Sequence, residues 1–125
     1  MLIAINPARQ FAQARNSQRV SNVNAILNAV GQYIADNKGN LPPGIGVVAA
    51  DIPKVLCEAL VPTYMPALPT APGSTFDGEG LVKAKCPELD VAGKDSKYEI
   101  VQDADSRIKV TSSNPELSAV IEVIR

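Results

Sequence analysis

The feature that most constrains this chain is a helical pattern across residues 6–38. Asn6 suits the N-cap and Pro7 the first helical position, where a missing N–H costs nothing. Lys38 and Gly39 close the pattern, because glycine readily takes the left-handed conformation that ends a helix. Such a helix is about 45–50 Å long, more than a compact domain of this size is wide. Its apolar residues recur at three-and-four spacing, as a buried stripe requires: Val20, Val23, Leu27, Val30 and Ile34, widened by Ile26 and Tyr33.

The two halves of this helix differ in composition. Residues 8–22 are mostly alanine, glutamine, asparagine, serine and arginine, with Phe11 as their one aromatic side chain. Such a surface favours a helix but buries little against its own chain. Within a single domain, we therefore predict a protruding stalk over residues 1–22 and a globular head over residues 23–125. The alternative is an ordinary long helix that frays at its start.

Composition narrows the class of protein. The chain has 125 residues, 46% of them hydrophobic, and a net charge of −1, which describes one globular domain. Its 12 basic and 13 acidic residues are interspersed, so charge gives no case for a nucleic-acid site. Histidine, the commonest general base and metal ligand, is absent, and the sequence holds neither a G-x-S-x-G motif nor a phosphate-binding loop. We therefore predict that the protein is not an enzyme.

The two cysteines are Cys57 and Cys86, and their spacing does not match a metal-binding or redox motif. One disulfide between them would require an oxidising compartment. Closing this loop would stabilise the fold by about 3.5 kcal/mol in the chain-entropy model. The alternative is two buried free thiols in a cytosolic protein.

The middle of the chain contains many turn-forming residues. Residues 47–50 are a candidate extended piece, and residues 51–60 predict a short helix with Asp51 as its cap. The proline-rich residues 61–73 can form neither a central strand nor a long helix, so we expect them to lie extended over the surface. Their anchors would be Tyr64, Met65 and Leu68. A strand edge at residues 81–82 is the only element that the next segment suggests.

The C-terminal region predicts a small sheet. Residues 98–102 and 107–111 alternate between apolar and polar side chains and flank a turn at 103–106, which is typical of a hairpin. Residues 119–124 are more apolar and predict a third strand, either between other strands or against the helix. The sum is an α+β fold: a long N-terminal helix packed on a small C-terminal antiparallel sheet, with a proline-rich connection.

Three runs carry a resemblance to a known family. They are Ile-Asn-Pro-Ala-Arg-Gln at 5–10, Val-Asn-Ala-Ile-Leu-Asn-Ala-Val-Gly-Gln-Tyr at 23–33, and Asp-Asn-Lys-Gly-Asn-Leu-Pro at 36–42. Together they resemble the lower amphipathic helix of type IV pilins and type II secretion pseudopilins, and its exit into the first loop. Tyr-Met-Pro-Ala-Leu-Pro at 64–69 and the later hairpin are similar to the head of the same family.

The resemblance implies a structural subunit that polymerises through its N-terminal helix in a pilus or a secretion pseudopilus. Its partners would be other copies of itself, related pilin subunits and the inner-membrane assembly machinery. It would need no cofactor and would act at the cell surface or in the periplasm, from a precursor in the inner membrane. Leu2, Ile3, Ile5 and Phe11 would then face neighbouring helices, and the subunit's own sheet would cover Val23, Leu27, Val30 and Ile34. For Phe11, the alternative is a contact within its own subunit.

The chain departs from the family in one respect. Its 125 residues include neither the cleaved leader nor the following hydrophobic segment with an early glutamate. We therefore expect Met1 to fall near the end of that segment, which would supply the only membrane contact. The alternative function is a monomeric extracellular binding module that docks a partner through its long helix or its proline-rich segment.

The hairpin turn also suggests a metal site. Asp103 and Asp105, with Asp77, Glu79 or Asp95, could offer oxygen ligands to calcium, and major pseudopilins resemble this in having calcium near their C-terminal sheet. The motif alone supplies far fewer than the six to eight oxygens that calcium takes. The alternative is that these are ordinary turn aspartates.

Overall fold

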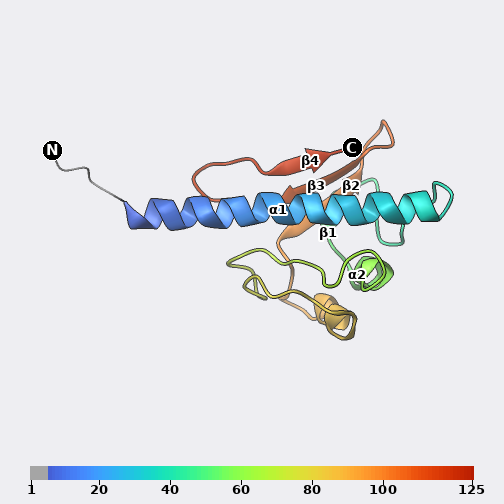
Figure 1. The fold of residues 1–125 in the computed structure, drawn as a ribbon, viewed down its shortest axis with the longest axis horizontal. Coiled ribbons are helices and arrows are strands. Elements are labelled where there is room, and N and C mark those ends of the chain that lie inside the picture. The colour runs from blue at the N-terminus through green and yellow to red at the C-terminus, as the bar shows by residue number, and fades with distance from the viewer. Residues whose placement is uncertain (1–5) are drawn as a thin grey trace.

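A computed structural model describes residues 6–125. Its elements are α1 (Pro7–Asp36), β1 (Ala50–Asp51), α2 (Lys54–Leu60), the 3₁₀ helix η1 (Lys83–Asp90), β2 (Tyr98–Gln102), β3 (Ile108–Ser112) and β4 (Glu122–Ile124). Figure 1 shows α1 running along the length of the molecule, with strands β2 to β4 on one side and α2 on the other. The predicted α+β fold, a long N-terminal helix packed on a small antiparallel sheet, is confirmed.

The ends of α1 follow from local sequence. Asn6 has extended backbone, and its side-chain Oδ1 accepts the N–H of Arg9 at 3.2 Å. At the other end, Lys38 and Gly39 have φ of 59° and 87°, and the Gly39 N–H donates to the carbonyl of Ile34 at 2.9 Å. This hydrogen bond caps the final turn. The helix therefore ends at Asp36, two residues before the predicted position.

Within residues 6–125 the strands form one four-stranded antiparallel sheet in the order β1-β2-β3-β4. The hairpin of β2 and β3 is confirmed, with Ile100 opposite Val110 and Tyr98 opposite Ser112. Alternation directs one set of side chains inward, and Tyr98, Ile100, Ile108 and Val110 are all buried. This face packs on α1.

The third predicted strand is confirmed, but it is shorter than expected. β4 pairs only with β3, through Val123 opposite Val110, so it is an edge strand and not a central one. It does contact α1, as the second alternative proposed. The predicted extra residues form the loop before β4, where the Ser112 N–H donates to the carbonyl of Ile121 at 2.8 Å.

Asp51 does not cap α2. It lies in β1 and pairs with Glu99 of β2, and the cap position belongs to Pro53, which makes no side-chain cap. Pairing with the sheet keeps Asp51 extended, so the helix begins only at Lys54. The prediction of a short helix here is confirmed, but its cap was placed two residues too early, at Asp51 and not Pro53.

Residues 61–96 are more deeply packed than the sequence suggested. Leu68, Thr70 and Ala71 are buried, so this part of the proline-rich segment does not lie over the surface. Leu68 and Leu81 exchange two backbone hydrogen bonds, of 2.9 and 2.8 Å, in an isolated antiparallel bridge. Only this bridge corresponds to the predicted strand edge at 81–82, and η1 follows it.

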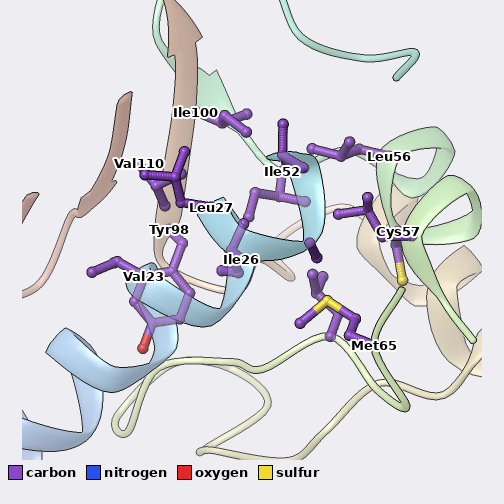
Figure 2. Packing of buried hydrophobic residues seen from close by; sticks show 14 of the residues in the cluster. Val23, Ile26, Leu27, Ile52, Leu56, Cys57, Met65, Tyr98, Ile100 and Val110 are labelled. Atoms are coloured by element: carbon purple, nitrogen blue, oxygen red, sulfur yellow. The ribbon is translucent and has the colours of Figure 1, made fainter. Parts of the chain in front are cut away.

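The core is built around α1. Figure 2 shows Val23, Ile26 and Leu27 between side chains of the sheet and side chains of α2 and the loop after it. One member of the predicted stripe is misplaced, because Val20 is 46% exposed whereas Arg19 is 2% exposed. The polar side chain of Arg19 thus occupies the buried position that was predicted for Val20.

Candidate assembly surface

Among the described residues, the start of α1 extends beyond the sheet and the loops of the head (Figure 1). Residues 7–11 are exposed, and Phe11 keeps 63% of its surface accessible. Ala12 is the first buried residue of the described chain, at 6% exposure. We call residues 7–14 the stalk, since polar contacts with the head begin at Arg15.

Arg15 and Arg19 both bind one carboxylate, that of Glu116 in the loop between β3 and β4. The Arg15 Nε and NH2 donate to its two oxygens at 2.7 and 2.6 Å, and the Arg19 NH1 donates at 2.7 Å. Asn16 and Glu116 add a reciprocal pair: the Asn16 amide donates to the Glu116 carbonyl at 2.8 Å and accepts its N–H at 2.9 Å. We call these four residues the clasp. The head therefore holds α1 from Arg15 onward, closer to the N-terminus than the predicted boundary at residue 23.

The electrostatics of the clasp follow from this geometry. Arg19 is almost fully buried, and its NH2 also donates to the carbonyl of Pro72 at 2.8 Å. Hydrogen bonds from Arg15 and Arg19 lower the pKa of Glu116 to about 2. Glu116 is therefore charged at neutral pH and supplies the counter-charge that a buried guanidinium requires.

A second polar contact of α1 lies at Asn22, about one turn of helix after Arg19. The Asn22 Nδ2 donates to the hydroxyl of Tyr98 at 2.8 Å and to the carbonyl of Thr70 at 3.3 Å. Tyr98 is fully buried, and burial raises the pKa of its hydroxyl. These directional bonds, with those of the clasp, fix the rotation of α1 on the sheet, so the stalk projects in one defined direction.

The residues predicted for the helix–sheet core and for helix packing have different surroundings. Val23, Leu27 and Val30 are at most 3% exposed, and Ile34 is partly buried against the same core. Phe11 is exposed, so the head does not cover it as the alternative proposed. The predicted packing residues Leu2, Ile3 and Ile5 lie outside the described residues.

The predicted disulfide between Cys57 and Cys86 is confirmed, with a Cα–Cα distance of 5.7 Å. Both residues are fully buried. The bond joins α2 to η1, which lie on the side of α1 away from strands β2 to β4 and far from the stalk in Figure 1.

The turn aspartates already have partners. The Asp103 Oδ1 accepts the backbone N–H groups of Asp105 and Arg107 at 2.9 and 3.0 Å. The Arg107 guanidinium lies 3.4 Å from each of the two carboxylates. Residues 6–125 hold no group of three or more Cys, Asp or Glu side chains placed to bind a metal. In this arrangement Asp103 and Asp105 do not fit a calcium site, because a cation would have to displace Arg107.

No protein-family model, curated protein or solved structure matches this chain. Among residues 6–125, we find no helix with both the length and the apolar character that crossing a bilayer requires.

Proposed function

We propose that this protein is a structural subunit of a helical filament, of the type IV pilus or type II secretion pseudopilus kind, and that it polymerises through its N-terminal helix. The observation that carries the proposal is the division of α1 into an exposed stalk and a docked half. In a helix of 30 residues, about 45 Å long, polar contacts with the head begin only at Arg15, and every stalk residue except Ala12 is exposed.

The stalk has the properties that side-by-side packing of helices needs. Phe11 offers a large exposed apolar side chain, and the small residues Ala8 and Ala14 beside it allow another helix to approach closely. The clasp holds the stalk in one direction, so every copy presents the same surface. Contacts between unlike surfaces of identical copies repeat, and they produce an open filament when the rotation between copies does not close a ring.

The head supports the same proposal. Its buried disulfide suits an oxidising compartment such as the cell surface or the periplasm. Its core fixes the helix but leaves the stalk for partners, which would be other copies, related subunits and the assembly machinery. Contact with the membrane would come through the hydrophobic segment that subunits of this kind carry before the stalk.

Immunoelectron microscopy on cells that make the protein tests the proposal. An antibody raised against the head should label surface or periplasmic filaments at regular intervals along their length. Label dispersed through the cell, with the protein monomeric in every fraction, would contradict the proposal. That result would favour the monomeric binding module.

A further inference from the structure

A groove of about 410 Å³ runs beside the second half of α1, on the side of β3 and the C-terminus. Its walls are mostly apolar, and among the described residues Arg125 is its only charged lining group. The guanidinium of Arg125 hydrogen-bonds Asn28 at the rim. The residues that line the groove include Leu27, Val30, Gly31, Ile34, Ile108 and Arg125.

Gly31 is the unusual member of this lining. It lies in the interior of α1, where glycine weakens a helix relative to alanine. Its backbone is helical, so no left-handed turn requires glycine at this position. Outside its own helical turns, no atom of the described residues lies within 4 Å of the place a Cβ would occupy. Contacts among the described residues thus do not require glycine here, and the open space above Gly31 leaves room for another chain to approach the helix closely.

The chain itself contains a segment that fits an apolar groove. Residues 1–5 are Met-Leu-Ile-Ala-Ile, without a charge or a strong hydrogen-bonding side chain. In one copy this segment cannot reach the groove. Leu27 lies about 32 Å along the helix from Asn6, whereas five extended residues span at most about 18 Å. If this segment fills the groove, it therefore comes from another copy.

We propose that the groove beside Gly31 receives residues 2–5 of a second copy, with Leu2, Ile3 and Ile5 against its apolar walls. The contact joins two different surfaces, residues 2–5 of one copy and the head of the next, and such contacts extend along a line of subunits when the rotation between copies does not close a ring. This inference rests on the proposed function and adds to it the position of one contact.

Thiol crosslinking tests the contact. Ile3→Cys and Gly31→Cys chains are prepared separately, one with a mass tag, then mixed in equal amounts and oxidised mildly. A disulfide forms only when two Cα atoms come within about 7 Å of each other. We expect mixed dimers to exceed the statistical share that random pairing gives. The matched control replaces Gly31→Cys with Val48→Cys, an exposed head residue outside the groove lining, and should give mixed dimers at the random level.

Mostly homotypic dimers, random pairing or equal yield with Val48→Cys would overturn the proposal. A second measurement avoids crosslinking: sedimentation equilibrium of the chain with Gly31→Trp or Gly31→Ala. The tryptophan side chain would occupy the groove and should weaken self-association at least about tenfold, whereas alanine should change it much less. Equal self-association of the two variants, with circular dichroism showing both folded, would also overturn it.

The two proposals can fail separately. Filaments that carry the antibody label, together with random crosslinking, would leave the filament function standing and remove the groove contact. Specific crosslinking in a protein that never labels filaments would keep the contact and remove the filament function.

Discussion

Arg19 of α1 and Glu116 of the loop before β4 are 97 residues apart in the chain, yet the Arg19 NH1 lies 2.7 Å from the Glu116 Oε2. Arg19 is 2% exposed, so this carboxylate neutralises a charge that water barely reaches. The same carboxylate also binds Arg15. One side chain therefore joins the C-terminal loop to the helix at the point where the stalk leaves the head.

Removing the carboxylate should destabilise the fold. Glu116→Gln leaves the buried Arg19 without a counter-charge, which is much worse than losing an exposed ion pair. We expect a lower urea midpoint for Glu116→Gln than for Arg15→Met. Arg15→Met removes only a partly exposed ion pair and keeps the pair between Arg19 and Glu116. A midpoint for Glu116→Gln equal to that of the wild-type protein would contradict this role of the clasp.

The same residue makes stability depend on pH. In the folded protein the pKa of Glu116 is lowered from 4.5 to about 2, so its ion pairs stabilise the fold fully above the unfolded value. This contribution is lost as the pH falls from about 4.5 through about 2. The difference in unfolding free energy between wild type and Glu116→Gln should therefore shrink over this range. If this difference in unfolding free energy stays constant down to pH 2, the charge of Glu116 does not contribute to stability.

Much of the fold could be predicted from local patterns. Asn6 and Pro7 marked the start of α1, and the recurrence of Val23, Leu27 and Val30 marked its buried face. Alternation around Ile100 similarly predicted the hairpin. In each case the information lies within a few residues of the element itself, where period and capping apply.

Other features depend on contacts that no local pattern reveals. The burial of Arg19 depends on Glu116, far along the chain, so residues 15–22 were assigned to the stalk although the head holds them. η1 contains Pro87 and buries little besides Cys86, so it has no amphipathic period to detect. β1 has two residues and is defined only by pairing with β2, which is why Asp51 was taken for a helix cap. The one sequence feature that could have indicated the groove is Gly31, a glycine among the apolar residues of the helix stripe.

The disulfide should contribute strongly to stability. Cys57 and Cys86 are separated by 29 residues, and opening a loop of this length is expected to lower the unfolding free energy by about 3.5 kcal/mol. Urea titration of Cys57→Ala/Cys86→Ala measures the loss, with reduced wild-type protein as a second form lacking the crosslink. A loss below about 1 kcal/mol would mean that the packing of α2 on η1 alone holds this region.

Truncation of a buried side chain on the docked half of α1 should be costly. Leu27→Ala leaves a cavity between the helix and the sheet and should lower the unfolding free energy by about 2–4 kcal/mol. Val48→Ala is the matched control, because Val48 is 75% exposed and its loss should change stability by less than about 0.5 kcal/mol. Similar effects of the two changes in urea titrations would contradict the helix–sheet core described above.

The most direct test of the filament proposal is Phe11→Asp, made in cells that produce the protein. Phe11 is 63% exposed, so a charged side chain there requires no burial and the variant should fold and unfold like the wild type. Electron microscopy should then show that labelled filaments are lost with Phe11→Asp and kept with Val48→Asp. Filaments of normal number and length with Phe11→Asp would contradict assembly through the stalk.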